Sequence, residues 1–406
     1  MKYYLIAGEP SGDLHGSYLI RAIRAEDPAA EFRAWGGDLM AAAGAELVKH
    51  YREMAFMGVV EVVRNLRTIL RNQRMCQEDI ADYAPDRLIL IDYSGFNLRI
   101  AKWARPAGLN ISYYISPQVW ASRSGRVKQI RANVDRMLVI LPFEEAWYAE
   151  RGVNVSFVGH PLLDVVQEAE SKGEKRGRKK GKGEKETRSQ DAKSVEGQAD
   201  TPTPRQLENP ITGKPDTPTT IALLPGSRKQ EITVGLPLML EAAARHPGHQ
   251  YVIAGAPAQD LAFYELIIAG STTPPNLSVV MNGTYGLLQR ADTAVVTSGT
   301  ATLETALFGV PQVVVYKGNW LAYRIAKWMI GDRIKYISLV NLVMDAPVVP
   351  ELIQADFTPD NLADHLQKTI AGPVRDQQLQ DLQELRKQLG SGGAAARAAH
   401  AIVTSS

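Results

Sequence analysis

Two turns rich in small residues follow apolar stretches in the second half of the chain. The first lies in Leu223-Leu224-Pro225-Gly226-Ser227-Arg228, and the second runs from Thr297 to Glu304. Backbone N–H groups and hydroxyls at a helix N-terminus bind phosphate, and an arginine fork matches phosphate oxygens. A carboxylate one turn into the second helix can accept from ribose hydroxyls. We therefore expect a bound nucleoside diphosphate, with Gly226, Ser227, Arg228, Ser298, Gly299, Thr300 and Glu304 around it.

A carboxylate in the first half follows a short apolar stretch. Asp92 comes directly after Leu88-Ile89-Leu90-Ile91, where a buried strand would end. At the carboxyl end of a parallel strand, Asp92 could take a proton from a sugar hydroxyl as a general base. The alternative is a helix N-cap. Ser94 could supply that cap instead, so position alone leaves both interpretations open.

Three further strand ends carry polar or aromatic residues. The first strand is followed by Gly8-Glu9-Pro10-Ser11-Gly12-Asp13. This segment is either a ligand-binding turn or a plain turn in which Asp13 is a cap. Tyr113 to Trp120 contains Gln118 and precedes Arg123, Arg126, Lys128 and Arg131. Aromatic rings beside cations suit a sugar and a phosphate, whereas core packing and a solvated basic helix are the alternative. His160, in Gly159-His160-Pro161, is either structural or functional.

One apolar segment lies beside a row of arginines. Residues 54–63, Met-Ala-Phe-Met-Gly-Val-Val-Glu-Val-Val, precede arginines spaced for one helical face. Such a pairing is typical of a protein that lies on an anionic membrane surface, although core packing or a subunit contact explains it nearly as well. Trp320 to Trp328 is a second candidate. The expected membrane contacts are Met54, Phe56, Met57, Val59, Val60, Arg64, Arg67 and Arg71.

The composition limits the class of protein. The 406 residues suffice for two domains, and a net charge of +2 gives no reason to expect a nucleic-acid partner. The single cysteine, Cys76, excludes a disulfide framework and favours the cytoplasm. No apolar run approaches the roughly 18 residues of a spanning helix. Neither predicted domain contains an Asp-x-Asp pair, so we expect no metal and no cofactor.

The elements that must position these residues alternate between strand and helix. Strands are predicted at 3–7, 32–35, 87–91, 110–115, 136–140 and 156–158, and again at 220–224, 250–254, 277–280, 293–297 and 312–316. Buried apolar strands separated by helices predict an α/β protein with two Rossmann-like, doubly wound domains facing a cleft. We expect an N-terminal acceptor-side domain at 1–167, a disordered polar insert at 168–218, a nucleotide-binding domain at 219–375, and a helical tail at 376–406.

The ordered set of motifs resembles the lipid-A-disaccharide synthase family, which consists of inverting glycosyltransferases of the GT-B type. The resemblance covers nearly the whole chain. The matching segments are Gly8–Asp13, Gly36-Gly37 with Met40, Met57-Gly58 with Glu61-Val62, Ile91-Asp92 with Phe96-Asn97, Ser116–Trp120, Pro142–Glu144, Gly159-His160, Leu223–Arg228, Ser298–Glu304, Ser338-Leu339 with Asn341-Leu342, and Glu351 with Gln354.

The resemblance implies the transfer of 2,3-diacylglucosamine from its UDP derivative to 2,3-diacylglucosamine 1-phosphate, which gives a β-1,6 disaccharide and UDP. It implies that Asp92 is the general base, that Arg228 lies near the donor diphosphate, and that Asn341 and Gln354 line the donor side. The expected acceptor-side residues are Glu9, Ser11, Gly12, Asp13, Asn97, Gln118 and His160. It also implies a peripheral position on the cytoplasmic face of the inner membrane, contact with lipids there, and the capacity to form a homodimer with exchanged C-terminal elements.

The chain departs from this family at two places. Many relatives have Asp-x-Pro-Asp-Phe-Asn where residues 92–97 are Asp-Tyr-Ser-Gly-Phe-Asn, so Asp92 is the one carboxylate of this turn. The insert at 168–218 is also outside the usual pattern. Two other functions stay open at this point: a UDP-N-acetylglucosamine epimerase, which would act on the nucleotide sugar alone, and a non-catalytic nucleotide-sugar-binding protein of the membrane surface.

Overall fold

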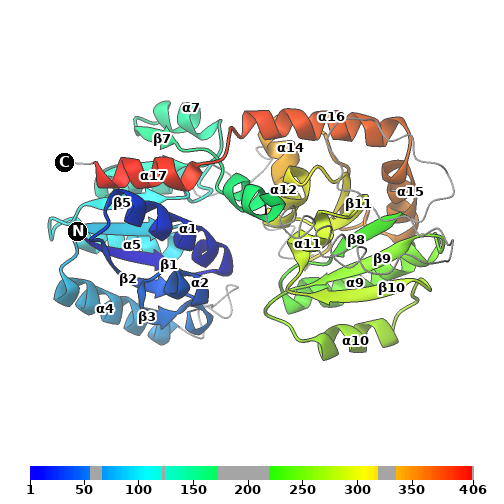
Figure 1. The fold of residues 1–406 in the computed structure, drawn as a ribbon, viewed down its shortest axis with the longest axis horizontal. Helices are drawn as coiled ribbons and strands as arrows, with labels where there is room; N and C mark the ends of the chain where they lie inside the picture. The colour runs from blue at the N-terminus through cyan, green and yellow to red at the C-terminus, as the bar shows by residue number, and fades with distance from the viewer. Residues whose placement is uncertain (55–65, 121–123, 172–218, 319–334, 405–406) are drawn as a thin grey trace, which may run out of the picture. The chain divides into compact units, whose positions relative to one another are not determined.

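A computed structural model describes residues 1–54, 66–120, 124–171, 219–318 and 335–404. The chain divides into two units, one made of Met1–Asp164 with Lys387–Ser406 and the other of Val165–Arg386. The residues of the polar insert from 172 to 218 lie outside the described part, and so does the segment around Trp320 and Trp328. Each unit is an α/β domain with its own parallel sheet (Figure 1).

The sheet of the first unit has the order β3-β2-β1-β4-β5-β6-β7, and all of its strand pairs are parallel. Its strands are β1 (Lys2–Ala7), β2 (Glu31–Gly36), β3 (Glu46–His50), β4 (Arg87–Ile91), β5 (Ile111–Tyr114), β6 (Arg136–Val139) and β7 (Val155–Phe157). Its helices are α1 (Pro10–Glu26), α2 (Asp38–Ala42), α4 (Leu66–Tyr83), α5 (Ser94–Ala104), α6 (Val127–Asn133), α7 (Glu144–Ala149) and α17 (Ala394–Val403), with short 3-10 turns η1 (Tyr51–Glu53) and η2 (Ser124–Arg126).

Apolar side chains fill both faces of this first sheet because successive residues of a strand point to opposite sides. Tyr4 and Ile6 of β1 pack in one core with residues of α4, α5 and α6, whereas Tyr3 and Leu5 pack in a second core with residues of α1 and α17. The continuous apolar strands of the sequence are thus covered by helices on both faces, as a parallel sheet requires.

The second unit contains a six-stranded parallel sheet in the order β10-β9-β8-β11-β12-β13. Its strands are β8 (Thr220–Leu224), β9 (Gln250–Gly255), β10 (Leu277–Met281), β11 (Thr293–Thr297), β12 (Gln312–Tyr316) and β13 (Glu351–Ile353). Its helices are α9 (Lys229–Ala244), α10 (Leu261–Ala269), α11 (Thr284–Leu288), α12 (Thr300–Leu307), α14 (Leu339–Met344), α15 (Pro359–Ile370) and α16 (Pro373–Gln388). The fold class predicted from the sequence, α/β with two doubly wound parallel sheets, is confirmed.

The C-terminal helices do not form a single tail. Helix α16 counts with the second unit up to Arg386, whereas α17 packs against α1 of the first unit (Figure 1). The Asp164 carboxylate accepts hydrogen bonds from the N–H groups of Gly393, Ala394 (3.2 Å) and Ala395 (2.9 Å) at the start of α17. The Arg397 Nε donates to the Val158 carbonyl at 2.8 Å. These contacts fix the end of the chain to the first unit.

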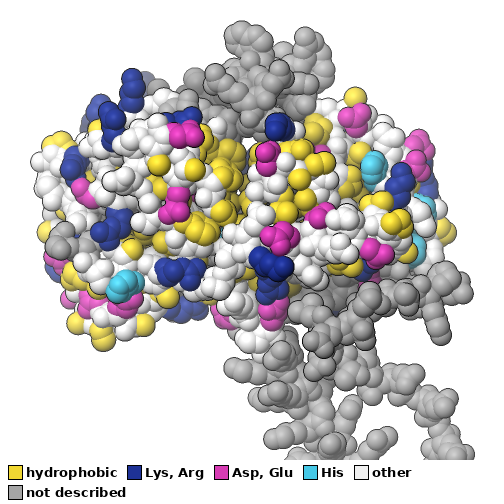
Figure 2. Space-filling view, turned by 90° about the horizontal axis from the view of Figure 1, so that it is seen from above, with side chains coloured by type: hydrophobic (Ala, Val, Ile, Leu, Met, Phe, Trp, Pro, Cys, Tyr) yellow, Lys and Arg dark blue, Asp and Glu magenta, His cyan; other side chains and the backbone are white. Residues whose placement is uncertain are grey.

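The surface has no dominant charge on the face seen in Figure 2, where acidic and basic side chains are intermingled. This distribution agrees with the low net charge of the chain, +2. Among the described residues, no helix combines the length and the apolar character that crossing a membrane would demand.

Candidate functional site

The two groups of predicted site residues lie at equivalent places in the two sheets. In the first sheet β1 has β2 on one side and β4 on the other, and in the second β8 has β9 on one side and β11 on the other. Chain connections leave such a strand pair in opposite directions, which opens a crevice beyond the carboxyl ends of the two strands, where α/β proteins bind ligands. Glu9 and Asp92 follow β1 and β4, whereas Arg228 and Ser298 follow β8 and β11.

The backbone after β4 has an unusual conformation. Asp92 and Tyr93 have φ angles of 44° and 46°, in the left-handed region that non-glycine residues seldom adopt. The buried Asn97 amide donates to the Asp92 carbonyl at 2.9 Å and to the Ile91 carbonyl at 3.2 Å, and the Tyr113 hydroxyl also donates to the Asp92 carbonyl. Strained backbone of this kind persists only where surrounding groups hold it and is concentrated at functional sites.

The Asp92 side chain is half-buried and is not a helix cap. Helix α5 begins at Ser94 with Tyr93 in the N-cap position, and no side chain caps it. Burial, and next the negative charge of Glu9, raise the pKa of Asp92 to about 6. A carboxyl group with a pKa close to neutrality is suited to exchange protons with a substrate.

The segment after β1 is a helix start rather than a turn. Helix α1 begins at Pro10, so Ser11, Gly12 and Asp13 belong to its first turn, and Glu9 occupies the N-cap position. Proline at the first helical position favours this early start. A side chain at Gly8 would have its Cβ 2.3 Å from the Tyr93 ring, so Gly8 allows Tyr93 to lie against the end of β1.

Asp13 is buried and caps a helix other than its own. Its carboxylate accepts hydrogen bonds from the N–H groups of Gly37 (2.9 Å), Leu39 (3.2 Å) and Met40 (3.0 Å) at the start of α2. The alternative role foreseen for Asp13, a cap, therefore applies to a helix 25 residues further along the chain. Asp13 thereby fixes the Gly36-Gly37 segment at the end of β2.

We expect Asp13→Asn to lower the free energy of unfolding by about 1–3 kcal/mol. An amide carries no charge, and its NH2 group cannot accept a hydrogen bond from any of the three backbone N–H groups. Thermal and urea denaturation would measure the change. Asp38→Asn is a matched control, since the Asp38 side chain is 75% exposed. Equal stability of the two variants would contradict the capping role.

Two histidines of the first unit are buried together. Burial lowers the pKa of His15 to about 4, and burial followed by the proximity of His15 lowers the pKa of His160 to about 3. Both rings are therefore neutral at pH 7. The His160 Nδ1 accepts a hydrogen bond from the Leu162 N–H at 3.2 Å. This contact holds the turn that follows β7, which is a structural role for the His160 ring.

The segment after β5 leads to the exposed Gln118. Ile115 has a φ of 66°, a genuine strain for a β-branched residue, and Ser116 forms a 2.7 Å hydrogen bond with the Tyr148 hydroxyl. At the start of α7, the buried Glu144 accepts hydrogen bonds from the Ile140 and Leu141 N–H groups, at 3.1 and 2.9 Å. Burial raises the pKa of Glu144 to about 7, and no feature of its sequence motif indicated this buried carboxyl group.

In the second unit, Arg228 lies at the N-terminus of α9. It occupies the N-cap position, its side chain is 60% exposed, and its Nη1 donates to Glu231 at 3.2 Å. Gly226 has a φ of +105°, and a Cβ there would lie 2.9 Å from the Glu231 carboxylate. Glycine at 226 thus lets the turn pass close to Glu231, and Glu231 orients the Arg228 guanidinium.

The turn after β11 exposes backbone at the start of α12. Gly299 is the N-cap, and Gly299 and Thr300 are both exposed. The Ser298 hydroxyl donates to the Ile337 carbonyl at 3.1 Å, which leaves its oxygen able to accept. The amide groups at this helix start have the polarity that an anion requires.

Glu304 lies one turn into α12 and is half-buried. Burial raises its pKa to about 7, and no group among the described residues donates a hydrogen bond to its carboxylate. A desolvated carboxylate without a donor is costly, and a ligand hydroxyl would relieve that cost. The geometry is compatible with the ribose contact expected for Glu304.

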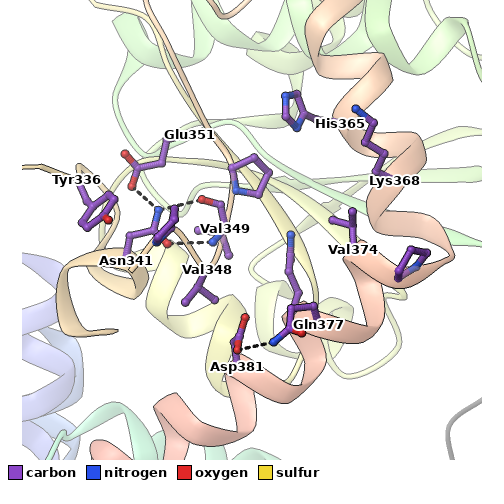
Figure 3. Close-up of a pocket in the computed structure, with 14 residues that line it drawn as sticks. Tyr336, Asn341, Val348, Val349, Glu351, His365, Lys368, Val374, Gln377 and Asp381 are labelled. Carbon is purple, nitrogen blue, oxygen red and sulfur yellow. Dashed lines mark hydrogen bonds between the residues drawn. The ribbon is translucent and has the colours of Figure 1, made fainter. Parts of the chain in front are cut away.

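Asn341 has a structural role. Its amide donates to the Val349 carbonyl (2.8 Å) and to Glu351 (3.0 Å), and its oxygen accepts from the Val349 N–H (2.9 Å). Asn341 lines a cavity of about 680 Å³ that also involves residues of α15 and α16, as Figure 3 shows. This cavity lies before the amino end of β13, away from the strand ends that carry Arg228 and Ser298.

Gln354 follows β13 at the carboxyl edge of the second sheet. Its φ of 54° is left-handed, and its N–H donates to the Tyr316 carbonyl at 2.8 Å. The side-chain nitrogen of Gln354 is buried without a partner among the described residues. Of the two polar residues expected on the donor side, Gln354 is the one whose amide can still bind a ligand.

The residues expected to contact a membrane divide into three groups. Met54 is 1% exposed and belongs to the core that contains Trp35 and Phe96, so its side chain cannot contact lipid and that expectation is wrong. Arg67 and Arg71 are exposed on α4. Phe56, Met57, Val59, Val60 and Arg64 lie outside the described residues.

Comparisons with known proteins agree with the expected family. A family model described as lipid-A-disaccharide synthetase matches residues 3–187 and 201–404. A lipid-A-disaccharide synthase of Syntrophus aciditrophicus is 40% identical over 405 residues, which cover 98% of this chain and 96% of the relative. The enzyme of Myxococcus xanthus is 38% identical over 404 residues, with the same coverage.

Solved structures share the fold at low sequence identity. The UDP-GlcNAc 2-epimerase of Neisseria meningitidis, bound to UDP-GlcNAc, has a TM-score of 0.63 at 11% identity, with 100% of both chains covered. The glycotransferase of kitacinnamycin has a TM-score of 0.60 at 15% identity, with 99% of this chain and 98% of the other covered. At such identities these likenesses establish the architecture alone.

Proposed function

The chain belongs to the lipid-A-disaccharide synthase family, and we propose that the residues after β1 and β4 and those after β8 and β11 bind the two substrates of one transfer reaction. The activity is that of lipid-A-disaccharide synthase in lipid A biosynthesis, and the epimerase and the non-catalytic alternatives are set aside. In this proposal the first unit binds the acceptor, 2,3-diacylglucosamine 1-phosphate, and the second unit binds the donor, UDP-2,3-diacylglucosamine. The main support is that Asp92 and Arg228 both follow switch-point strands.

The reaction we propose is a single displacement with inversion. The Asp92 carboxylate takes the proton of the acceptor 6-hydroxyl while that oxygen forms a bond to the anomeric carbon of the donor. The bond between the anomeric carbon and the diphosphate oxygen breaks, and its electron pair leaves with UDP. A base with a pKa of about 6 is mostly ionised at neutral pH and still accepts a proton readily.

The second unit would stabilise the departing UDP. Arg228 supplies positive charge to the diphosphate, the exposed start of α12 at Gly299 and Thr300 supplies N–H groups, and Glu304 accepts from the ribose. A charge-assisted hydrogen bond contributes about 1.5–3 kcal/mol. Gln354, with its unpartnered amide nitrogen, supplies a further contact on the donor side.

We also propose that the first unit lies on a membrane surface, because both substrates are lipids. Arg67, Arg71 and Leu70 are exposed on α4, and Leu70 is 52% exposed. Cationic side chains beside an apolar one are typical of a helix that binds anionic lipid. A homodimer with exchanged C-terminal elements is a further proposal, in which α17 of a second copy would take the place beside α1.

Mass spectrometry of the products tests the transfer. The chain supplied with both diacyl sugars should yield the disaccharide 1-phosphate and an equal amount of UDP, and the chain supplied with donor alone should leave the nucleotide sugar unchanged. Conversion of the donor alone to an isomer, which has the same mass and is resolved by NMR spectroscopy, would instead indicate an epimerase. Binding of UDP without any product would indicate a non-catalytic protein.

A further inference from the structure

One arginine of the first unit contacts the segment that follows β4 and has no role in the reaction as described so far. Arg126 ends the η2 turn directly before α6, and its Nη1 donates to the Ser94 Oγ at 2.9 Å. Ser94 is the first residue of α5 and stands two positions after Asp92. This hydrogen bond joins the segment after β5 to the segment after β4.

The electrostatic environment of Tyr113 places Arg126 and Asp92 near the same group. Burial raises the pKa of the Tyr113 hydroxyl well above its usual value, the Asp92 charge adds to that rise, and the Arg126 charge opposes it. The Tyr113 hydroxyl donates to the Asp92 carbonyl. A single buried hydroxyl therefore lies within range of both charges, which places the Arg126 guanidinium close to the Asp92 turn.

The turn after β4 has open space beside it but carries acidic side chains. Gly95 follows Ser94, and a side-chain carbon built there meets no atom within 4 Å. Asp92 and Glu9 are both acidic, and Glu9 raises the pKa of Asp92. Two acidic groups would repel a phosphate ester brought to the same place, so a cation beside them is needed to admit such a substrate.

Other cations of the same stretch differ from Arg126. Lys128 and Arg131, on α6, are exposed, whereas Arg126 is half-buried and tied to Ser94. An arginine whose orientation is fixed by a hydrogen bond loses less freedom on binding, and its planar fork matches two phosphate oxygens. Among the described cations of this stretch, Arg126 is therefore the one that is pre-organised for a phosphate.

We propose that Arg126, oriented by Ser94, binds the phosphate group of the acceptor and makes the chain prefer a phosphorylated acceptor sugar. The inference rests on the proposed function, in which the acceptor carries a 6-hydroxyl at one end of its ring and a 1-phosphate at the other. With Asp92 at the hydroxyl, Arg126 would hold the phosphate and thereby orient the ring. Arg126 acts on affinity and specificity and takes no part in proton transfer.

Steady-state kinetics with two acceptors test this inference. We expect Arg126→Gln to lower kcat/KM for 2,3-diacylglucosamine 1-phosphate by about 10- to 100-fold, mainly through KM, because one charge-assisted contact is lost. The value for 2,3-diacylglucosamine without phosphate, and the KM for the UDP donor, should not change. Lys128→Gln removes an exposed charge two residues away and should leave all three values unchanged.

Ser94→Ala separates positioning from binding. It should reduce the preference for the phosphorylated acceptor less than Arg126→Gln does, and it should have no further effect when Arg126 is already glutamine. Arg126→Lys should restore part of the preference, because it keeps the charge without the fork. Thermal denaturation of each variant would exclude a loss of folding as the cause.

The outcomes distinguish this inference from the function on which it rests. If Arg126→Gln lowered kcat/KM equally for the two acceptors, the role of Arg126 would be overturned while the transfer reaction stands. The same holds if the substitution changed only the KM for the donor. Absence of transfer by the unmodified chain with either acceptor would overturn the proposed function and this inference together.

Discussion

Replacing Asp92 with asparagine is expected to lower kcat by about 100- to 10,000-fold, the usual contribution of a general base. The amide has nearly the same shape but cannot accept the proton of the acceptor hydroxyl. The Asn97 and Tyr113 hydrogen bonds to the Asp92 carbonyl involve backbone and should survive. Turnover with purified lipids measures the effect, and Asp82→Asn, which alters an exposed carboxylate of α4, is the control.

The pH profile gives an independent measure of the same group. Because the pKa of Asp92 is raised to about 6, kcat/KM should fall as the pH drops below about 6 and should level off above it. Glu9→Gln removes the negative charge that contributes to the rise, so the acidic limb should move to lower pH. If the acidic limb of the profile stayed at the same pH in both Asp92→Asn and Glu9→Gln, it would belong to the titration of another group.

Stability should move in the opposite direction from activity in Asp92→Asn. A carboxyl group whose pKa is higher in the folded than in the unfolded state opposes folding once it ionises, and this effect grows as the pH rises from about 4 through about 6. Asparagine does not ionise, so the variant should be at least as resistant to urea as the unmodified chain at pH 7. A less stable variant would show that lost activity came from lost structure.

Replacing Arg228 with alanine is expected to lower kcat/KM for the donor by about 100-fold or more, because a cation aimed at a leaving diphosphate stabilises the transition state most strongly. The affinity for UDP should also fall, since the product carries the same diphosphate. Isothermal titration with UDP measures that affinity directly. Glu231 would lose its partner at 3.2 Å, but the Arg228 side chain is 60% exposed, so the fold should be little affected.

Arg290→Ala is the matched control for Arg228→Ala. Arg290 is an exposed arginine of the same unit, and it precedes the amino end of β11 rather than following the carboxyl end of a strand. Unchanged UDP affinity in Arg228→Ala, or an equal loss in both variants, would remove Arg228 from the nucleotide site.

The central strands were predictable from the sequence because they are buried on both faces. The segments 87–91, 220–224, 293–297 and 312–316 coincide with β4, β8, β11 and β12. The edge strands β3 and β13 were not predicted. The first contains Glu46, Lys49 and His50 and is only half-buried, and the second has three residues, so neither presents the apolar run that marks a strand.

The positions of the site residues were more predictable than their contacts. Residue type and spacing placed Asp92 and Arg228 at strand ends, because strands and their turns are local features. The hydrogen bonds of Asp13 to the start of α2 and of Asn341 to Val349 depend on how separate segments pack. Asn97 belongs to the same class, since its amide holds the backbone at Asp92 in place.

The position of α17 has a consequence for synthesis of the protein. Ala398, Ala399 and Ile402 complete a core whose strands all come from the first 164 residues. A ribosome delivers those strands early and the last helix late, with an interval on the order of tens of seconds at usual elongation rates. Throughout that interval the nascent polypeptide leaves exposed the apolar side of α1 that α17 covers in the folded unit, which is the kind of surface that chaperones bind.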